Sequence, residues 1–338
     1  MNLHNWKPVD MNAETALIIG GGAIGVEHHL PRLRRLVGCS HITIMDPSPS
    51  RRSQLETDFK GDGQIQVISE TPANTVDIVV IATPPKFHLS YFRQYAPLAA
   101  TIIIEKPMGL TADECMTIRN DAREHGTAVF VPMIRRTLPG YGLLRELLQS
   151  GRFGSIRQVS ASEGGVFSWQ AVSLGSFSHE LNGGGVLMDT GPHTLDLLLQ
   201  LFGEMQCNSA WMDGFKPAVE ANCELRLTNN DGVEIRLLLS RNRNLACEIR
   251  IEAEKAELTI GIRSNRISVR EVDGPDYELF PTGLSSHDDP GFAQLFDDWY
   301  GQFLMSGDNI GVGPDEALLL AAISDRAYSI AQPIKGGF

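Results

Sequence analysis

Residues 183–196 read GGGVLMDTGPHTLD and place a carboxylate and an imidazole at a spacing at which they could act together. Asp189 and His193 are four residues apart, and side chains with that separation lie on one face of a helix, about one turn apart. Histidine is the side chain best suited to exchange a proton near neutral pH, and a neighbouring carboxylate can hold a hydroxyl group. The run therefore predicts a site at which a hydroxyl group gains or loses a proton.

Each of these residues also has a structural interpretation. His193 could be a buried histidine without chemistry, and Asp189 could cap a helix that starts near it. Asp196 is interpreted as structural, because it leads into the apolar run LDLLLQLFG. The spacing of the three side chains would suit a metal site, but chemistry that relies on a lysine and a histidine needs no metal, so none is expected.

A glycine-rich run near the start of the chain has the spacing of a phosphate-binding loop. The strand-like run TALIIG leads directly into GGGAIG, which forms the pattern Gly-x-Gly-x-x-Gly. The early glycines permit a tight turn and a close approach to a diphosphate, and the last lets helix and strand pack closely. Backbone amides at the start of the helix then bind the diphosphate. We predict that a dinucleotide contacts Gly20, Gly22, Ala23, Ile24 and Gly25. The alternative is a glycine turn without a ligand.

Asp46 ends the next predicted strand, about 20 residues after the last glycine of the loop. A carboxylate at this position accepts hydrogen bonds from ribose hydroxyls and repels a ribose phosphate, so Asp46 favours NAD over NADP. Arg51 and Arg52 follow closely and keep NADP open, because an arginine could bind that phosphate. Their other interpretation is a solvated helix face.

Two short runs, ATPPKFH and EKPMG, end the fourth and fifth predicted strands. Both lie at carboxyl ends of parallel strands, the edge at which open α/β sheets bind ligands. Lys106 could there donate to a substrate oxygen or to a nicotinamide amide, and its charge would stabilise a developing oxyanion. Taken alone, it could equally be a surface lysine in a turn that Pro107 restrains, for which a cis peptide bond is one option. The predicted cofactor contacts at this edge are Thr83, Pro84, His88, Glu105 and Lys106.

The elements that must position these residues fall into two sets. Up to residue 133, short apolar runs (TALIIG, HITIMD, IQVIS, VDIVVIAT, TIIIEKP and AVFVPM) alternate with stretches of helical character. Such runs are typical of strands buried on both faces of a parallel sheet. Thr111 and Glu114 form a capping box at the start of one predicted helix, and Gly126 stands where that helix should end. The pattern predicts a Rossmann-type α/β domain over residues 1–133.

From residue 134 the pattern changes to helices and hairpins. The helical run GYGLLRELLQSG is followed by strand-like SIRQVSASEG, and later alternating runs surround the turn signal NNDG. Two helices are predicted near 290–305 and 314–331. Residues 134–338 are thus predicted to form an α+β domain with a large, mainly antiparallel sheet, and the last helix could pack back on the first domain.

Composition excludes several classes of function. The formal net charge of −12 disfavours nucleic acids and anionic membranes as partners. The five cysteines form no CxxC pair, so neither a zinc site nor a disulfide framework is expected, and reduced thiols indicate the cytoplasm. The polar N-terminal run MNLHNWKPVDMNAE does not resemble a secretory signal, and no apolar run is long enough to span a membrane.

The runs GGGAIG, ATPPKFH, EKPMG and GGGVLMDTGPHTLD occur in this order, and together they resemble the glucose–fructose oxidoreductase and inositol 2-dehydrogenase (Gfo/Idh/MocA) family of nicotinamide-dependent oxidoreductases. The passage RRTLPGYGLLRELLQSGRFGSI is also similar to the family's link between its domains, so the resemblance covers most of the chain. It implies that Lys106, Asp189 and His193 form a catalytic set. His193 would then be the general base in oxidation, Asp189 would orient the substrate and Lys106 would polarise its oxygen.

The sequence departs from the family where the substrate is expected. Thr137 follows Arg136 where an aromatic residue is usual, and Ile134 and Arg135 stand where Asn and His are frequent. These departures leave the identity of the substrate open. Arg136 and Trp169 are predicted to contact it, although Trp169 could equally be a packing anchor for its loop.

The expected function is a nicotinamide-dependent oxidoreductase, with NAD favoured over NADP, that interconverts a secondary alcohol and a ketone on a sugar, sugar derivative or cyclitol. The resemblance also implies a homodimer or homotetramer. Two alternatives remain: an enzyme that retains NAD and breaks glycosidic bonds without net redox change, and a regulator that binds NAD(H) without turnover.

Overall fold

The computed structural model of this chain describes residues 13–166, 177–285, 289–305 and 312–334. Contacts between residues divide these segments into two compact units. The first unit runs to Ile134 and also takes in the segment from Phe296 to Leu318, whereas the second contains the other described residues. The first unit therefore includes a late segment that the sequence assigned to the second domain.

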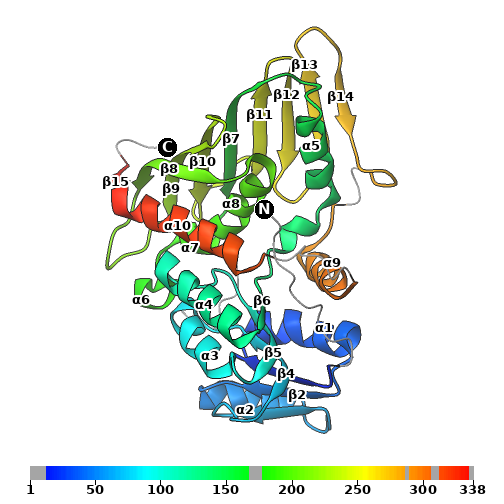
Figure 1. Cartoon of the computed structure of the whole chain (residues 1–338), viewed down its shortest axis with the longest axis vertical. Coiled ribbons are helices and arrows are strands. Elements are labelled where there is room, and N and C mark those ends of the chain that lie inside the picture. Colours follow the sequence, from blue (N-terminus) through cyan, green and yellow to red (C-terminus); the bar gives the residue numbers. More distant parts are fainter. Residues whose placement is uncertain (1–12, 167–176, 286–288, 306–311, 335–338) are drawn as a thin grey trace. The chain divides into compact units, whose positions relative to one another are not determined.

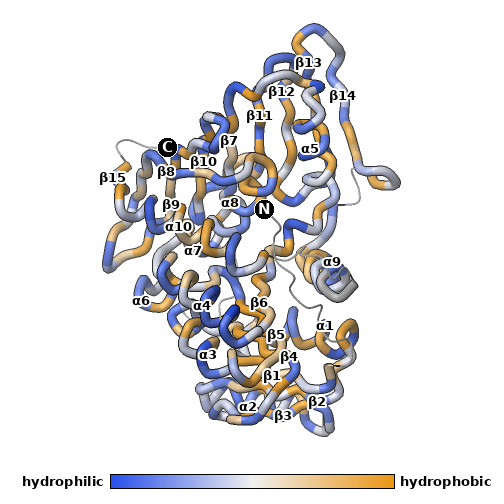
Figure 2. Tube along the Cα trace, viewed as in Figure 1, coloured by the Kyte–Doolittle hydropathy of each residue, from blue (hydrophilic) through white to orange (hydrophobic). Residues whose placement is uncertain are grey.

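The first unit is built on a parallel sheet of six strands in the order β3-β2-β1-β4-β5-β6. Its central strands are buried on both faces, as their continuous apolar sequences predict. Figure 2 shows the hydrophobic residues concentrated on these strands. The sheet has the strand order of a doubly wound dinucleotide-binding fold. The strands are β1 (Thr15–Ile19), β2 (His41–Met45), β3 (Ile65–Ile68), β4 (Val76–Ile81), β5 (Ala99–Ile104) and β6 (Ala128–Phe130).

Helices follow most of these strands, and α3 and α4 lie together on one side of the sheet (Figure 1). The Thr111 half of the predicted capping box is confirmed at α4, where the Thr111 hydroxyl accepts from the Glu114 amide at 3.2 Å. The Glu114 carboxylate accepts from the Leu110 amide at 2.8 Å. Gly126 ends this helix in a left-handed conformation, as predicted. The helical segments are η1 (Ile24–His29), α1 (Leu30–Arg32), η2 (Leu33–Val37), α2 (Pro49–Asp58), η3 (Pro85–Phe87), α3 (His88–Tyr95) and α4 (Ala112–His125).

The connection from β3 to β4 contains no helix, in contrast to the predicted alternation. Its few residues include Pro72, whose carbonyl accepts from the Tyr95 hydroxyl at 2.5 Å and so holds the connection to α3. A cavity of about 490 Å³ lies between this connection and the strands, with Thr15 and His41 in its lining. These residues begin β1 and β2, so the cavity lies at the edge of the sheet opposite to the glycine loop.

The second unit is built on a mixed, mainly antiparallel sheet in the order β14-β13-β12-β11-β7-β10-β9-β8-β15. Two pairs within it, β7 with β10 and β8 with β15, are parallel. The predicted hairpin at NNDG is confirmed, because β9 and β10 pair antiparallel around it. The strands are β7 (Ile156–Gly164), β8 (Met205–Met212), β9 (Asn222–Asn229), β10 (Glu234–Ser240), β11 (Glu248–Ala253), β12 (Ala256–Gly261), β13 (Ile267–Glu271), β14 (Asp276–Leu279) and β15 (Gln332–Pro333).

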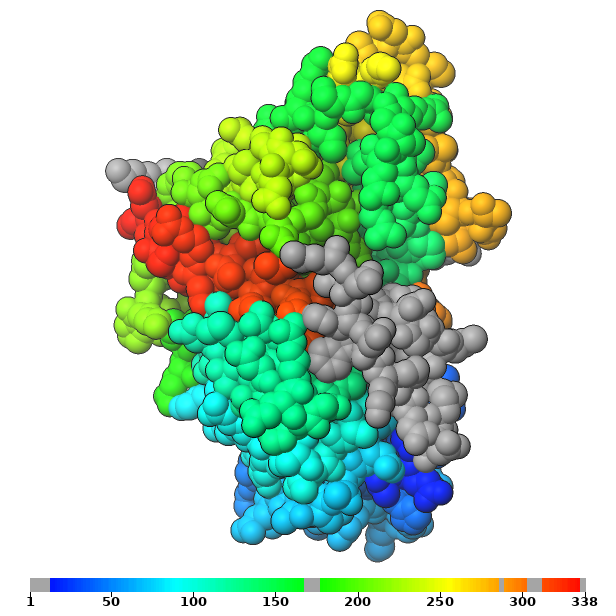
Figure 3. Space-filling model, in the orientation of Figure 1, coloured from blue at the N-terminus to red at the C-terminus, as the bar shows by residue number. Residues whose placement is uncertain are grey.

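One face of this sheet is apolar and carries the helices of the unit. Alternate residues of β9, β10 and β11 are buried, and α7 contacts both β9 and β10. Helix α5, green in Figure 3, lies at the same end of the unit as the yellow and orange strands β12–β14. The Tyr141 hydroxyl of this helix donates to the Gly261 carbonyl. The helices are α5 (Pro139–Gln149), α6 (His179–Asn182), α7 (Val186–Asp189) and α8 (Gly191–Phe202).

Three helical segments cross the boundary between the units in sequence: η4 (Ile134–Thr137), α9 (Phe292–Met305) and α10 (Pro314–Ile330). The two helices predicted near 290–305 and 314–331 are thereby confirmed. None of the helices in the described part of the chain is long and apolar enough to cross a membrane.

Candidate active site

The glycine loop after β1 gives each of its glycines a separate role. Gly20 has a φ of +106°, and a Cβ there would lie 2.5 Å from the carbonyl oxygen of Ala82. A Cβ on Gly25 would overlap the carbonyl of Gly20, so this glycine permits the close contact between helix and loop. A Cβ on Gly22 would meet no atom within 4 Å, so the space above the backbone of Gly22 is open. A tight turn, open space above the backbone and close packing of helix and loop are the three features that the binding of a dinucleotide diphosphate requires.

The helix that starts after this loop begins at Ile24, with Ala23 as the residue before it. Its first amides therefore lie at the glycine loop, where an anion would be stabilised. Thr83, just beyond the end of β4, has a buried hydroxyl without a hydrogen-bond partner, and Pro84 follows it. A buried polar atom of this kind at the carboxyl edge of the sheet is consistent with a bound ligand.

Asp46 lies at the end of β2 and faces the glycine loop. Its carboxylate accepts from the Gly21 amide at 2.9 Å and from the Ser48 amide at 2.8 Å. Arg51 and Arg52, because of which NADP remained an alternative cofactor, both donate to backbone carbonyls. Arg51 donates to the Gly21 carbonyl at 2.6 Å, and Arg52 donates to those of Asp46 and Pro47.

His88 joins the ends of β4 and β5. Its ring is fully buried, with Nε2 2.8 Å from the carbonyl oxygen of Thr83 and Nδ1 3.0 Å from that of Pro107. Burial lowers the pKa of His88, although the carbonyl contacts act in the opposite direction. The sequence analysis predicted His88 as a cofactor contact. In the structure its ring contacts backbone carbonyls of the loops that follow β4 and β5.

Glu105 is held from two directions at the end of β5. One carboxylate oxygen lies 2.9 Å from Nε2 of His29, and the other accepts from the Lys106 amide at 3.1 Å. Burial acts to raise the pKa of Glu105, but the hydrogen bond from His29 and the charges of His29 and Lys106 outweigh it and lower the pKa. The carboxylate thus fixes the backbone of Lys106. The bond from Lys106 to Pro107 is cis.

Helix α9 completes this support from the far end of the chain. The Tyr300 hydroxyl lies 2.7 Å from Nδ1 of His29, so that Tyr300, His29 and Glu105 form one buried chain of hydrogen bonds. Because a carboxylate can only accept, His29 donates through Nε2, and in its neutral form its Nδ1 accepts from Tyr300. The sequence gave no signal for this contact.

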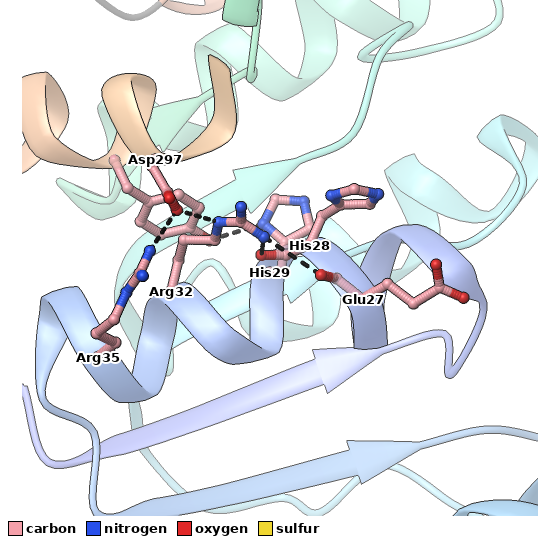
Figure 4. A network of polar contacts seen from close by, with 7 residues as sticks. Glu27, His28, His29, Arg32, Arg35 and Asp297 are labelled. Atoms are coloured by element: carbon pink, nitrogen blue, oxygen red, sulfur yellow. Dashed lines mark hydrogen bonds and ion pairs between the residues drawn. The ribbon is translucent and has the colours of Figure 1, made fainter. Parts of the chain in front are cut away.

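A second group of contacts joins the same two segments (Figure 4). Asp297 of α9 accepts from Nε of Arg32 at 2.7 Å and from Arg35 at 2.6 Å. Arg32 also donates to the backbone carbonyls of Glu27 and His28. The His28 ring stacks on Phe296, with 4.9 Å between the ring centroids. These contacts attach α9 to the helix that follows the glycine loop.

In the second unit, the GGG run is held by a buried carboxylate. Glu220 accepts from the amides of Gly185 and Leu187, both at 2.9 Å, and from the Tyr328 hydroxyl. A Cβ on Gly185 would overlap the backbone of Glu220, and a Cβ on Gly184 would overlap the Tyr328 hydroxyl. Glu220 therefore caps α7 from a distant loop. Neither Glu220 nor Tyr328 had a recognisable signal in the sequence.

Asp189 and His193 lie on two consecutive helices instead of one. Helix α7 begins at Val186, before the predicted start near Asp189, and ends at Asp189, while α8 begins at Gly191. Pro192 has no N–H, and the His193 amide donates to the Thr190 carbonyl, so the helix is interrupted between the two residues. The capping position of α8 is Thr190, whose side chain makes no capping hydrogen bond, and Asp189 stands one residue before it.

Arg136 binds a carboxylate of its own chain. Its Nε and Nη2 donate to Asp196 at 2.6–3.0 Å, and Asp196 is only 1% exposed. The structural interpretation of Asp196 is thereby confirmed. Arg135 binds Glu163 in the same bidentate way, with distances of 2.6 and 2.7 Å. Trp169, the other predicted substrate contact, lies outside the described residues. No group of three or more metal-ligating side chains occurs in the described part of the chain.

The parallel sheet with its glycine loop, together with a second unit that carries a carboxylate and a histidine, defines a dinucleotide-binding protein of two units. Two domain models of one family match the chain, the NAD-binding Rossmann fold of the GFO_IDH_MocA oxidoreductase family over residues 15–133 and the GFO/IDH/MocA C-terminal domain over residues 141–259. The chain belongs to the GFO/IDH/MocA family of oxidoreductases.

Curated relatives include inositol 2-dehydrogenase of Burkholderia multivorans, which is 26% identical over 55% of this chain and 54% of that protein. The rhizopine catabolism protein MocA of Rhizobium meliloti is 31% identical over 40% of this chain and 41% of that protein. The chain spans about half the length of the curated relatives it matches.

Solved structures show the same fold. A levoglucosan dehydrogenase in complex with NADH and levoglucosan has a TM-score of 0.78 at 17% identity, over 93% of this chain and 97% of that one. A 3-ketoreductase from Actinomadura kijaniata in complex with NADP and TDP-benzene also has a TM-score of 0.78, at 18% identity, over 96% of this chain and 99% of that one. At these identities the likeness concerns the fold.

Proposed function

We propose that this chain is a nicotinamide-dependent oxidoreductase that interconverts a secondary alcohol and a ketone on a sugar, sugar derivative or cyclitol. The observation that carries the proposal is the glycine loop, in which Gly20, Gly22 and Gly25 supply the turn, the open space and the close contact that a diphosphate needs. Family membership supports the reaction class. The names of the relatives, among them an inositol and a levoglucosan dehydrogenase, support the substrate class.

A bound nicotinamide would accept the hydride of a carbinol carbon in oxidation or supply it in reduction. The chain must then move the hydroxyl proton, and we assign this step to the imidazole of His193. Asp189 would hold the hydroxyl in place, and the ammonium group of Lys106 would stabilise negative charge on the reacting oxygen. Arg136 is given a structural role through Asp196.

The proposal is tested by following nicotinamide reduction while the purified protein meets a panel of neutral sugars, sugar acids, sugar phosphates and inositols. We expect turnover of at least one compound, and its loss by about 100-fold or more in Lys106→Ala and in His193→Ala. Lys60→Ala, at an exposed lysine of the first unit, is the matched control and should retain full activity. Cofactor binding without reduction by any compound would contradict the proposal.

We further propose that the cofactor is NAD. The Asp46 carboxylate would repel a ribose phosphate, while Arg51 and Arg52 donate to backbone carbonyls of the loop. The ratio of the Kd values for NAD and NADP should therefore favour NAD. In Asp46→Asn this preference should fall by about tenfold or more, because a hydrogen bond to a charged group is lost together with the repulsion.

The ratio is the informative quantity, since a general loosening of the loop would weaken both dinucleotides together. Glu56→Gln removes an exposed carboxylate from the same helix, α2, and should leave the ratio unchanged. A preference for NADP in the unmodified protein would contradict the assignment.

We propose that the sheet of the second unit pairs with that of a second copy. Its outer face carries alternating charges, including the pairs Arg236–Glu224 at 2.8 Å and Arg250–Glu248 at 2.8 Å. Leu238 lies among them on the same face, between the buried Leu237 and Leu239. A face with both charge signs can complement itself about a two-fold axis. A homodimer or a homotetramer would follow from this pairing.

The cytoplasm is the proposed location of the protein. Its five cysteines are all free thiols, four of them buried. Reduced cysteines are the usual state in that compartment.

A further inference from the structure

The second unit buries a carboxylate that contacts α8. Glu163 lies near the end of β7, where it continues the buried alternate positions Val159 and Ala161. Its carboxylate accepts from Arg135 in a bidentate arrangement at 2.6 and 2.7 Å, and also from the hydroxyl of Thr194. Burial acts to raise the pKa of Glu163, but the charge of Arg135 and the hydrogen bonds from Arg135 and Thr194 outweigh it and lower the pKa. Glu163 is therefore a charged group inside the unit.

A buried ion pair of this kind is a poor source of stability. The cost of removing two charges from water can exceed their attraction, and apolar side chains of similar volume often stabilise a core better. What a bidentate pair supplies is geometry, because its parallel hydrogen bonds fix the guanidinium and the carboxylate in one relative orientation. Arg135 thus orients the carboxylate of Glu163, one oxygen of which accepts from Thr194.

Thr194 lies in the first turn of α8, immediately after His193. The first amides of a helix need partners outside it, and the side chain of Thr190 at the capping position makes no capping hydrogen bond. Pro192 in the same turn has no N–H to donate. The Thr194 side chain is fully buried, and its hydroxyl ties this turn to β7 through Glu163. This bond therefore attaches the start of α8 to the sheet.

The side chain of His193 leaves α8 between two attached neighbours. Successive residues are about 100° apart around a helix, so Thr194 lies about 100° to one side of His193 and Asp196 about 60° to the other. Asp196 is held by Arg136 at 2.6–3.0 Å. Because both flanks are attached to buried pairs of arginine and carboxylate, rotation of the helix about its own axis is restricted.

We propose that Thr194 and Glu163 are positioning residues for the proton transfer assigned to His193, and that the Arg135–Glu163 pair sets the direction of the imidazole through the Thr194 hydroxyl. The inference rests on the proposed function and adds two residues to the same site. A proton is transferred only within hydrogen-bond reach, and a displacement of about 1 Å can cost about 100-fold in rate. A small rotation of α8 should therefore reduce turnover without weakening the binding of the cofactor.

The test compares side chains at position 194 with and without the hydroxyl. Thr194→Val has nearly the volume of threonine and cannot donate to Glu163, whereas Thr194→Ser can. The matched control is Thr127→Val, because Thr127 is also buried and its hydroxyl donates to the Ala96 carbonyl of the first unit at 2.5 Å. The measured quantities are kcat, KM and the Kd of the cofactor, for the full chain below its melting temperature and with a substrate identified by the panel.

We expect Thr194→Val to lower kcat by about 10- to 100-fold and to leave KM and the cofactor Kd within about threefold of their values in the unmodified protein. Thr194→Ser should keep kcat within about threefold. Thr127→Val also loses a buried hydrogen bond, so it should lower the melting temperature without changing kcat. Thr194→Ala removes the hydroxyl without placing a methyl group against the carboxylate, and it should repeat the result of Thr194→Val.

A second measurement does not depend on turnover. With carbon-13 at Cε1 of the histidines, the nuclear magnetic resonance signal of His193 is identified by its loss in His193→Ala. This signal should move in Thr194→Val, return towards its original position in Thr194→Ser, and stay unchanged in Thr127→Val.

An unchanged kcat or an unmoved His193 signal in Thr194→Val would overturn the inference. A fall in kcat that Thr194→Ser shares in full would also overturn it, because the hydroxyl would then have no part in the effect. If no compound is turned over, the proposed function fails, and the His193 signal still decides whether Thr194 positions the imidazole.

Discussion

Single glycines determine the path of the backbone in both motif loops. Gly20 and Gly25 are enclosed by backbone atoms of the first unit, and Gly185 is enclosed by the backbone of Glu220 in the second. In each case the neighbour is main chain, which cannot rotate away as a long side chain would. Any side chain at these positions must displace the loop itself.

Gly185→Ala should therefore destabilise the second unit. We expect a loss of about 3 kcal/mol in the free energy of unfolding, because the new Cβ would overlap the backbone of Glu220. Chemical denaturation followed by circular dichroism measures this change.

The matched control is Gly142→Ala in α5, where a Cβ would meet no atom within 4 Å. Alanine should be neutral there, or stabilising by about 0.5–1 kcal/mol, because the helix gains a better helix former. Equal stability of the two variants would show that the GGG run can move away from Glu220.

Residue types in the motifs could be read from the sequence, but the partners of those residues could not. The predicted roles of Gly20, Gly22 and Gly25 agree with their surroundings because they depend on neighbours close in the chain. The pairing of Arg136 with Asp196 and the capping of α7 by Glu220 depend on side chains that meet only after folding. No local pattern encodes such contacts.

Helix α9 shows the same difference at the scale of elements. Its apolar spacing predicts a helix near 290–305, and the structure confirms it. Its attachment to the helix after the glycine loop, through Asp297 and Tyr300, joins segments more than 260 residues apart and has no signature in either segment. Through the hydrogen bonds from Tyr300 to His29 and from His29 to Glu105, α9 helps to hold the backbone of Lys106.

Tyr300→Phe should weaken that support without creating a large cavity. Loss of the hydroxyl leaves the buried Nδ1 of His29 without this partner, which should lower the free energy of unfolding by about 1–3 kcal/mol. Tyr91→Phe, at a half-buried tyrosine of α3, is the control and should change stability by less than about 0.5 kcal/mol. Equal effects of both changes would exclude the hydrogen-bonded chain as a source of stability.

The alternation of strands and helices in the first unit followed from buried apolar runs, with one exception. Between β3 and β4 the short segment around Pro72 contains no helix, although alternation predicts one. The break between α7 and α8 is a second difference from the prediction, because Pro192 interrupts the helix that the spacing of Asp189 and His193 predicts.

At the scale of the whole molecule, the outer face of the second unit's sheet predicts self-association. Light scattering after size-exclusion chromatography should give at least twice the mass of one chain. Leu238→Arg, in the middle of this face, should reduce the mass towards that of the monomer, because it adds an unpaired charge to the interface. Val272→Arg, 68% exposed just after β13, is the control. A monomer in the unmodified protein would contradict the pairing of sheets.

The central claim is that this chain moves a hydride between a carbinol carbon and a nicotinamide. The most direct test supplies NAD together with a substrate of the panel that carries deuterium on the carbinol carbon, and determines by mass spectrometry where the deuterium is found. The account predicts one deuterium in the recovered nicotinamide, and none when His193→Ala replaces the unmodified protein. Conversion of the substrate with no deuterium in the cofactor would contradict it.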